Sequence, residues 1–413
     1  MKNFFAKSVP HDHKSKFMKK LQIIAIFIFA ISTICGAGEN QWASLFDGKS
    51  LKGWTQKGGK AKYSVQDNCI VGQTIPSTPN SFLCTEKNYG DFILEYEFKI
   101  DPRLNSGVQV RSQENANGRV FGYQVEIDPD TKRNRMWTAG IYDEGRRGWL
   151  NDLSKNEAAR KAFKPNAWNK IKVRAIGDSI KTWLNGVPAA DLIDSMTQSG
   201  FIGLQVHGIG KKTDGPYEVR WKNIRIQDLG IHEWKPIFDG KTLEGWRALP
   251  GGTWTVSDET IVGKSPKEER RHGILLTEKQ FKDFTVKTKF RVNSGDSGFY
   301  FRCEPVKGGV SVHGFQVEVD YSQETGGLYE TGGRGWVVKP SEDEIPKKKY
   351  KPGEWTDLSL SAHGGRVVVH INGQKTAELI NDKGRSSGHI GLQLHGGDTM
   401  DVEFKNISIL KAK

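Results

Sequence analysis

GYQVEID, from Gly122 to Asp128, returns almost unchanged as GFQVEVD, from Gly314 to Asp320. In an extended strand, successive side chains point to opposite faces. The aromatic and branched residues of each copy therefore share one face, which suits burial, and the polar residues share the other. A solvated face has no reason to carry the same polar residues twice, so this face predicts a functional site. Its members are Gln124, Glu126 and Asp128 in the first copy and Gln316, Glu318 and Asp320 in the second.

Self-similarity extends along most of the chain. Three further stretches recur in the same order: LFDGKSLKGW (45–54) as IFDGKTLEGW (237–246), TAGIYDEGRRGW (138–149) as TGGLYETGGRGW (325–336), and GLQVHG (203–208) as GLQLHG (391–396). Solenoid repeats have periods of about 20–50 residues, and the spacing here is far longer. The sequence therefore predicts two whole domains in tandem, at 42–229 and 236–410.

The local patterns are those of short strands. Runs of alternating residues end at Gly, Asn or Asp, and the pairs Asn185-Gly186 and Asn372-Gly373 predict two-residue hairpin turns. One helix is expected in the first copy, from a capping-box pattern that opens at Ser154 and runs to Phe163. The predicted fold is all-β, with two antiparallel β-sandwiches, although the residues alone do not distinguish a jelly roll from other sandwich topologies.

The first 37 residues have the features of a signal peptide. Lys14, Lys16, Lys19 and Lys20 precede an apolar run from Leu21 to Ile34, which is too short for a membrane span. We expect cleavage after Ala37 and no later membrane-spanning stretch. A lipid anchor on Cys35 is the less favoured alternative. Either way the protein is expected to be exported, to the periplasm, the cell surface or the medium of a bacterium.

The net charge of +13 belongs partly to this segment. The densest later basic cluster, Lys347 to Lys351, lies between prolines and is expected to be a solvated loop rather than a nucleic-acid site. Cys69 and Cys84 are absent from the second copy together, where Thr260 and Leu276 stand. In an exported protein they are either a disulfide or two buried thiols, and buried thiols are favoured.

The same alternation places more polar side chains beside the repeated acids. These are Gln109 with Arg111 and Gln205 with His207 in the first copy, and Arg302 and Gln393 with His395 in the second. Each has a structural alternative: the arginines can pair with Glu126 and Glu318 across strands, and the histidines can belong to the framework. In the Gly-rich loop of each copy, a second group of residues suits stacking on a sugar ring: Tyr142, Arg147 and Trp149, and Tyr329, Arg334 and Trp336.

These motifs together resemble the 3-keto-disaccharide hydrolase domain, a former domain of unknown function, and the likeness covers both copies. The resemblance implies a concanavalin A-like antiparallel β-sandwich (jelly roll) for each domain. It also implies an exported bacterial enzyme that acts on oxidised glycosides, with a relation to family-16 glycoside hydrolases.

A ketone at C3 of a sugar acidifies the C2 hydrogen, so a base can start elimination of the C1 glycosidic oxygen before water adds. The expected base is His207 or Glu126, the enolate stabiliser Arg111 or a bound divalent ion, and the acid Tyr142 or Asp128. The second set is His395, Glu318, Arg302, Tyr329 and Asp320. No cofactor motif is present, so none is expected to be required, although a divalent metal ion stays open.

Two alternatives remain at this stage. One is a classical glycosidase with two carboxylates, which the second copy weakens because Ser322 stands where the first has Asp130. The other is a pair of lectin-like domains that bind carbohydrate without cleaving it.

Overall fold

The computed structural model describes residues 41–130, 135–308, 310–345 and 347–413. The predicted signal peptide and Cys35 lie outside these residues. No helix in the described part of the chain is long and apolar enough to cross a membrane.

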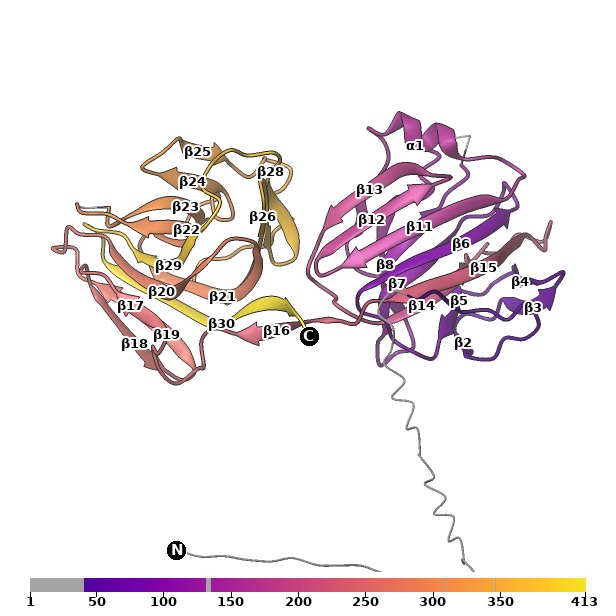
Figure 1. Ribbon diagram of the computed structural model, residues 1–413, viewed down its shortest axis with the longest axis horizontal. Coiled ribbons are helices and arrows are strands. Elements are labelled where there is room, and N and C mark those ends of the chain that lie inside the picture. Colours follow the sequence, from indigo (N-terminus) through magenta and orange to yellow (C-terminus); the bar gives the residue numbers. More distant parts are fainter. Residues whose placement is uncertain (1–40, 131–134, 309, 346) are drawn as a thin grey trace, which may run out of the picture. The chain divides into compact units, whose positions relative to one another are not determined.

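The first domain consists of two antiparallel sheets, coloured indigo to pink in Figure 1. The eight-stranded sheet has the order β13 (Val187–Ile193), β12 (Ser179–Leu184), β11 (Asn169–Ile176), β6 (Phe92–Ile100), β15 (Glu218–Asp228), β4 (Cys69–Gln73) and β3 (Lys62–Gln66), with β1 (Ala43–Ser44) beside β15. The seven-stranded sheet has the order β10 (Gly148–Asn151), β9 (Ile141–Glu144), β8 (Val120–Ile127), β7 (Ser106–Glu114), β14 (Phe201–Val206), β5 (Ser81–Thr85) and β2 (Trp54–Gly58).

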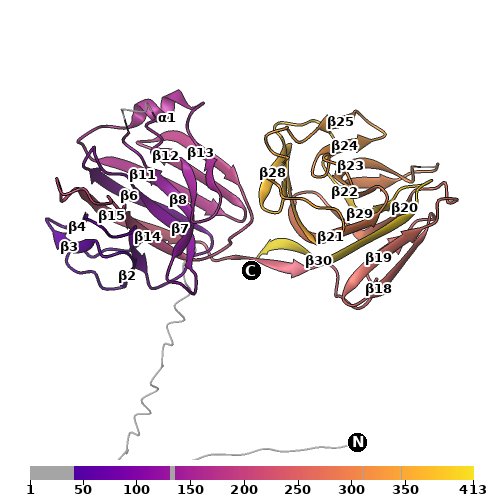
Figure 2. The same ribbon diagram turned by 180° about the vertical axis from the view of Figure 1, so that it is seen from behind.

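The second domain repeats this plan, in rose to yellow, and Figure 2 shows both domains from behind. Its eight-stranded sheet has the order β18 (Thr253–Ser257), β19 (Thr260–Ser265), β30 (Met400–Ala412), β21 (Phe284–Ser294), β26 (Thr356–His363), β27 (Arg366–Ile371) and β28 (Gln374–Leu379), with β16 (His232–Pro236) beside β30. Its seven-stranded sheet has the order β17 (Trp246–Ala248), β20 (Gly273–Phe281), β29 (Gly388–Leu394), β22 (Ser297–Pro305), β23 (Val312–Val319), β24 (Leu328–Thr331) and β25 (Gly335–Val338).

The apolar face of the opening stretch packs between the two sheets, as predicted. On β8, the side chains of Tyr123, Val125 and Ile127 are fully buried and belong to the core of the first domain. In the second domain, Phe315, Val317 and Val319 on β23 do the same. The all-β sandwich prediction is confirmed: each domain is a jelly roll of two antiparallel sheets, with its polar face on the outer side of the seven-stranded sheet.

Turns and caps explain several repeated motifs. Leu184 pairs with Val187 across the Asn185-Gly186 turn, and both turn residues have positive φ (50° and 86°), as a two-residue hairpin requires. The helix is shorter than expected. It spans Glu157–Ala162 (α1), and its N-cap is Asn156, whose side chain accepts a hydrogen bond from Ala159 N, so Ser154 does not cap it.

One smaller expectation is confirmed and another is corrected. Cys69 and Cys84 are free, buried thiols, because β4 and β5 belong to different sheets of the sandwich, so the alternative of a disulfide is wrong. In the loop after β25, Lys348 is only 2% exposed and donates to the carbonyls of Gln323 and Thr325 at 2.5 and 2.9 Å. That loop is therefore anchored at Lys348 rather than fully solvated.

Candidate functional site

The polar face predicted for the second domain forms a pocket of about 430 Å³. Strands β22, β23 and β29 are neighbours at the centre of the seven-stranded sheet, so alternate side chains from all three reach the same surface. The predicted residues that line the pocket are Gln316, Glu318, Asp320, Tyr329, Trp336, Gln393 and His395. The structure therefore brings together the acids and the imidazole of this domain.

A pair of carboxyl groups lies in the pocket. Glu318 and Asp296, which directly precedes β22, line the same pocket with their carboxyl groups within hydrogen-bonding reach of each other, while Asp296 Oδ1 has no hydrogen-bond partner among the described residues. Burial, followed by the nearby charges of Asp296 and Asp320, raises the pKa of Glu318 to about 10. The amide Nε2 of Gln316 lies 3.4 Å from both Glu318 oxygens. Glu318 is thus poised to be a carboxylic acid rather than a carboxylate at neutral pH.

Two histidines flank this pair. His395 Nδ1 lies 3.0 Å from Asp398 Oδ2, close enough for an ion pair but outside hydrogen-bond geometry, so this contact does not fix which ring nitrogen carries the proton. The His272 ring packs edge-on against His395, with ring centres 4.3 Å apart. Burial, and then the neighbouring His395, lowers the pKa of His272. His272 is therefore neutral, and its Nδ1 lies 3.3 Å from the Gln393 amide nitrogen.

Glu126 is the matching acid in the first domain, and a chain of amides holds it. Asn105 Nδ2 donates to its Oε1 at 2.6 Å, and Gln124 Nε2 donates to its Oε2 at 2.8 Å. Gln109 Nε2 in turn donates to Gln124 Oε1 at 2.7 Å. Burial outweighs these hydrogen bonds and raises the pKa of Glu126 to about 7. Gln109 and Gln124, predicted to bind substrate, thus position Glu126, whereas the fully buried amide of Gln205 has no hydrogen-bond partner among the described residues.

The first-domain histidine has its Nδ1 engaged. His207 Nδ1 lies 2.8 Å from the carbonyl oxygen of Gly208, so Nε2 is the available proton acceptor. Glu144 on β9 is close enough to His207 for their charges to interact, and it is hydrogen-bonded to Asn80. Burial raises the pKa of Glu144, and the charge of His207 opposes that shift. The acidic partner thus comes from β9 in the first domain and from the loop after β29 in the second.

Asp128 and Asp320 each accept hydrogen bonds from a neighbouring side chain. Asp128 Oδ2 accepts from both Arg135 Nε (2.9 Å) and Nη2 (2.7 Å), and the Arg135 guanidinium lies 5.0 and 5.7 Å from the rings of Trp137 and Trp149. Asp320 instead accepts from Thr325 Oγ1 at 2.6 Å and lines the pocket. An ion-paired Asp128 is poorly suited to donate a proton.

Arg111 and Arg302 do not reach the polar face. Arg111 Nε donates to Gly90 O (2.7 Å), Nη1 to Gly177 O (2.6 Å) and Nη2 to Asp91 Oδ1 (3.0 Å), all away from Glu126. Arg302 likewise donates to backbone carbonyls, including Gly364 O at 2.9 Å. Both arginines have positive φ (49° and 48°) at a β-bulge, where the register of the strand shifts and the alternation of faces is lost. Their expected placement beside the acids was wrong for this reason.

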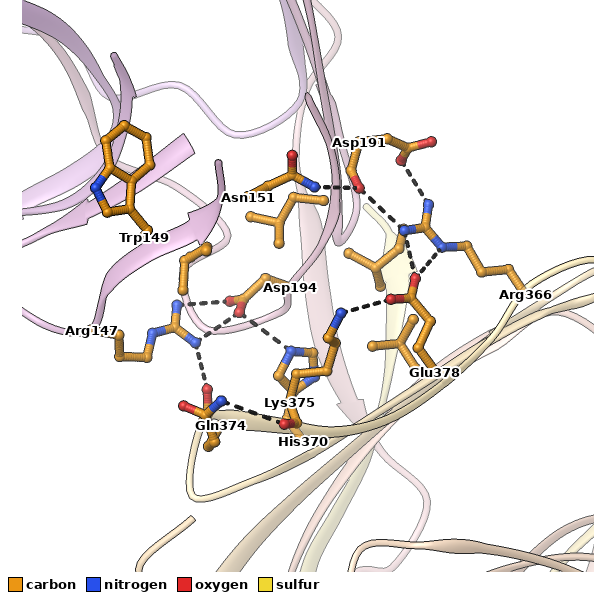
Figure 3. Close-up of a pocket in the computed structure, with 15 residues that line it drawn as sticks. Arg147, Trp149, Asn151, Asp191, Asp194, Arg366, His370, Gln374, Lys375 and Glu378 are labelled. Atoms are coloured by element: carbon orange, nitrogen blue, oxygen red, sulfur yellow. Dashed lines mark hydrogen bonds and ion pairs between the residues drawn. The ribbon is translucent and has the colours of Figure 1, made fainter. Parts of the chain in front are cut away.

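Arg147 and Arg334 are also held by ion pairs. Arg147 binds Asp143 at 2.6 Å and Asp194 at 2.7 Å, and Arg334 binds Asp382 at 2.7 Å. Figure 3 shows the Arg147–Asp194 pair in a second pocket, where Glu378 similarly binds Arg366 and Lys375. The Arg147, Arg366 and Lys375 side chains of this pocket thus have carboxylate partners, whereas Glu126 and Glu318 on the polar face have no lysine or arginine partner among the described residues.

The loop aromatics form the same pair in each domain. Tyr142 and Trp149 meet edge to face at 5.4 Å, and Tyr329 and Trp336 at 5.5 Å. Tyr329 and Trp336 line the second-domain pocket. Burial raises the pKa of Tyr142, so its hydroxyl stays protonated and can donate a hydrogen bond. This placement suits a sugar ring packed on the indole with a hydroxyl donor beside it.

Sequence reasoning missed four residues of the two sites: Asn105, Asp296, Asn80 and His272. A signal was present, because Asp296 and Asn105 both precede Ser-Gly at the start of a repeated strand. His272 and Asn80 differ between the copies, so comparing the copies for identity could not find them.

No group of three or more His, Cys, Asp or Glu side chains in residues 41–130, 135–308, 310–345 and 347–413 is arranged to hold a metal ion. The divalent ion considered from the sequence has no candidate cluster in that part of the chain.

Comparison with known proteins places the chain in a family. The model of the 3-keto-alpha-glucoside-1,2-lyase-like domain matches residues 41–227 and again residues 233–410. A 3-keto-disaccharide hydrolase from Bacteroides thetaiotaomicron is 24% identical over 235 residues, which cover 42% of this chain and 76% of the relative.

Solved structures with similarity to the chain include two from bacteria. A putative glycosyl hydrolase from Parabacteroides distasonis has 23% identity and a TM-score of 0.34 and covers 46% of this chain and 94% of its own. The carbohydrate binding module CBM66 from Bacillus subtilis has 17% identity and a TM-score of 0.33 and covers 40% of this chain and 96% of its own. On the two family matches, the chain belongs to the 3-keto-alpha-glucoside-1,2-lyase-like domain family and contains two copies of that domain.

Proposed function

We propose that the protein is a carbohydrate-active enzyme that cleaves glycosides oxidised at C3, by elimination followed by hydration. One observation carries the proposal: each domain places two groups on the same face of its seven-stranded sheet. These are an imidazole whose Nε2 has no hydrogen-bond partner among the described residues and a carboxyl group of raised pKa. A base and an acid are the two groups that this reaction needs. The family and the hydrolase named above support the substrate class.

The imidazole is the proposed base. Nε2 of His207 or His395 takes the C2 proton, and the C2–H electrons form an enolate with the C3 ketone. The contact of His207 Nδ1 with the Gly208 carbonyl oxygen, at 2.8 Å, orients the first ring, and the contact of His395 Nδ1 with Asp398 Oδ2, at 3.0 Å, holds the second near its acidic neighbour. The hydroxyls of Tyr142 and Tyr329 are the proposed donors to the enolate oxygen, in place of the arginines.

The carboxyl group is the proposed acid. As the enolate collapses, a C1=C2 double bond forms, the bond between C1 and the glycosidic oxygen breaks, and that oxygen takes a proton from Glu126 or Glu318. Water then adds its hydroxyl to C1 and a proton to C2, which regenerates the 3-keto sugar. A raised pKa keeps the proton on each glutamate until the leaving oxygen needs it.

The test compares a 3-keto-disaccharide with its unoxidised parent in heavy water, with released sugars followed by mass spectrometry. We expect cleavage of the oxidised substrate alone, with deuterium at C2 of the product, and loss of about 10²–10⁴-fold in rate in the double variant Glu126→Gln/Glu318→Gln. The exposed Glu86→Gln is the matched control. Cleavage of the parent without deuterium would instead support a two-carboxylate glycosidase, and binding without any product would support a lectin.

A further inference from the structure

Asp296 and Asn105 occupy the same place in the two domains. Each is followed by Ser-Gly, and the serine hydroxyl of each donates to the carbonyl of the matching glutamine, Ser106 to Gln205 O at 2.6 Å and Ser297 to Gln393 O at 2.7 Å. The backbone at this point is therefore the same in both copies. The two sites differ here in one chemical respect, an amide in one and a carboxyl in the other.

That difference changes what the neighbouring glutamate meets. Asn105 offers Glu126 an N–H, at 2.6 Å, which stabilises the ionised carboxylate. Asp296 has no N–H to offer, and its carboxyl group lies within hydrogen-bonding reach of that of Glu318. Two carboxyl oxygens in such contact need a proton between them, because two adjacent carboxylates repel each other strongly in a buried site.

The surroundings supply no fixed positive charge to relieve that repulsion. None of the described side chains that line the pocket is a lysine or an arginine. The titratable groups that face the pair are Asp320, Glu324, His272, His395, Asp398, Tyr300 and Tyr329. His395 is the one potential cation whose charge favours ionisation of Asp296, and it is itself paired with Asp398.

We propose that Asp296 is a positioning residue of the second-domain site: its carboxylate holds the catalytic proton on Glu318, a role that Asn105 does not fill for Glu126 in the first domain. The inference rests on the proposed function for its catalytic meaning. Glu318 delivers this proton to the leaving oxygen, and the ionised Asp296 then favours its recovery from solvent. The second domain is thus built to keep its acid protonated in alkaline solution, where the first domain has lost its own.

The pH dependence of the second domain tests this in a His207→Ala background, where only that domain reports. Asp296→Asn copies the residue that the first domain carries naturally, so the variant is expected to fold. If Glu318 then behaves like Glu126, kcat/KM should fall about tenfold at about pH 8 and change little at about pH 6. The exposed Asp343→Asn is the matched control and should leave the whole profile unchanged. A uniform loss at every pH, or an unchanged alkaline limb, would overturn the proposal.

The reverse substitution, at Asn105 in the first domain, tests the same proposal. In a His395→Ala background, Asn105→Asp should extend the activity of the first domain toward alkaline pH, because Glu126 would then face a carboxylate. No extension in a folded variant would contradict the role assigned to this position.

Infrared spectroscopy tests the carboxyl pair without any substrate. The full chain at about pH 8 should show the stretching band of a protonated carboxyl group, lost in Asp296→Asn and in Glu318→Gln but kept in Asp343→Asn. Absence of the band in the unaltered protein would show that Asp296 and Glu318 do not share a proton, even if the enzyme is active. If the band behaves as expected but no 3-keto-glycoside is cleaved, the proposed function fails and the carboxyl pair stands.

A chelator arm separates the shared proton from a bound cation. Activity and the infrared band should survive EDTA, because a proton rather than a metal ion joins Asp296 to Glu318. Loss of activity in EDTA with recovery on added Ca²⁺ or Mn²⁺ would overturn the proposal, since a cation bound there would displace the proton.

Discussion

Glu126 is a carboxyl group that folding removes from water and surrounds with amides. Its pKa rises from 4.5 to about 7, so the folded protein prefers its neutral form. A folded pKa above the unfolded value means that the ionised group costs stability. That cost is absent below about pH 4.5, grows between the two pKa values and is complete above about pH 7. We interpret this loss of stability as the consequence of having a buried carboxyl group that can donate a proton near neutral pH.

The stability of Glu126→Gln should therefore depend on pH. At about pH 8 the variant escapes the cost of ionising a buried group, so its free energy of unfolding should exceed that of the unaltered protein by up to about 3 kcal/mol. At about pH 4 the advantage should vanish, since the carboxyl group is then neutral in both states. Denaturant unfolding at the two pH values measures the difference, and the exposed Glu86→Gln is the control. Equal stability at about pH 8 would mean that Glu126 is not buried in ionised form.

Alternation along strands predicted much of the site at this scale. Glu126, Glu318, His207 and His395 lie on the polar face because their strands are regular up to those residues. Asp296 precedes β22 and His272 precedes β20, so the alternation of side chains along a strand did not predict which face their side chains would join. Both repeated histidines have an acidic neighbour, which is Glu144 for His207 and Asp398 for His395. These acids do not occupy matching positions in the two copies, so the repeat did not indicate them.

At the scale of the element, the bulge in β7 and β22 accounts for the misplaced arginines. One extra residue in a strand reverses the faces beyond it, and no sequence signal marked the bulge at Arg111, where glycine is usual for positive φ. The glycine that opens the repeated stretch belongs to the same feature. A Cβ at Gly122 would lie 2.8 Å from Ser112 Cα, and one at Gly314 would lie 2.5 Å from Cys303 Cα. The repeated stretch thus begins with a glycine because the backbone at this position lies too close to the bulged strand for a side chain.

Other repeated motifs are structural in the same way. Asp47 Oδ1 accepts from the backbone N–H groups of Lys49 and Ser50, both at 2.7 Å, and Trp54 Nε1 donates to Leu45 O at 2.8 Å. Asp239 and Trp246 repeat these contacts. The stretch FDGK…GW therefore identifies the fold because it closes a turn, and it carries no part of the polar face.

Replacing Arg111 should damage the fold and spare the chemistry. Arg111→Ala leaves two buried carbonyls and the buried Asp91 without its guanidinium, so the free energy of unfolding should fall by about 3–5 kcal/mol. The exposed Arg103→Ala should change stability by less than about 0.5 kcal/mol. Denaturant titration measures both, with kcat determined on the folded fraction. A stable Arg111→Ala protein with a large loss in kcat would restore the role of enolate stabiliser that the sequence suggested.

At the scale of the whole molecule, the two copies share a plan and differ in what surrounds the acid. From Asp128 to Thr138 the first copy has ten steps of chain where the second, from Asp320 to Thr325, has five. Both threonine hydroxyls accept from the backbone N–H of the aspartate at 3.1 Å, so the ends of the two loops are equivalent. The longer loop brings Arg135 and Trp137 to the first site. The repeat predicted two domains, but the differences between their sites lie in these non-identical residues.

The two sites should work independently. The described residues assigned to each site come from one sandwich, and each sandwich has its own proposed acid, proposed base and aromatic pair. His207→Ala and His395→Ala should each remove the contribution of one domain, the two residual rates should add up to that of the unaltered protein, and the double variant should lose about 10²–10⁴-fold. Steady-state kinetics on a 3-keto-disaccharide measure this, with the exposed His363→Ala as control. Loss of all turnover in either single variant would contradict independent sites. It would mean that the two sites catalyse successive steps of one reaction, because only then would both histidines be required.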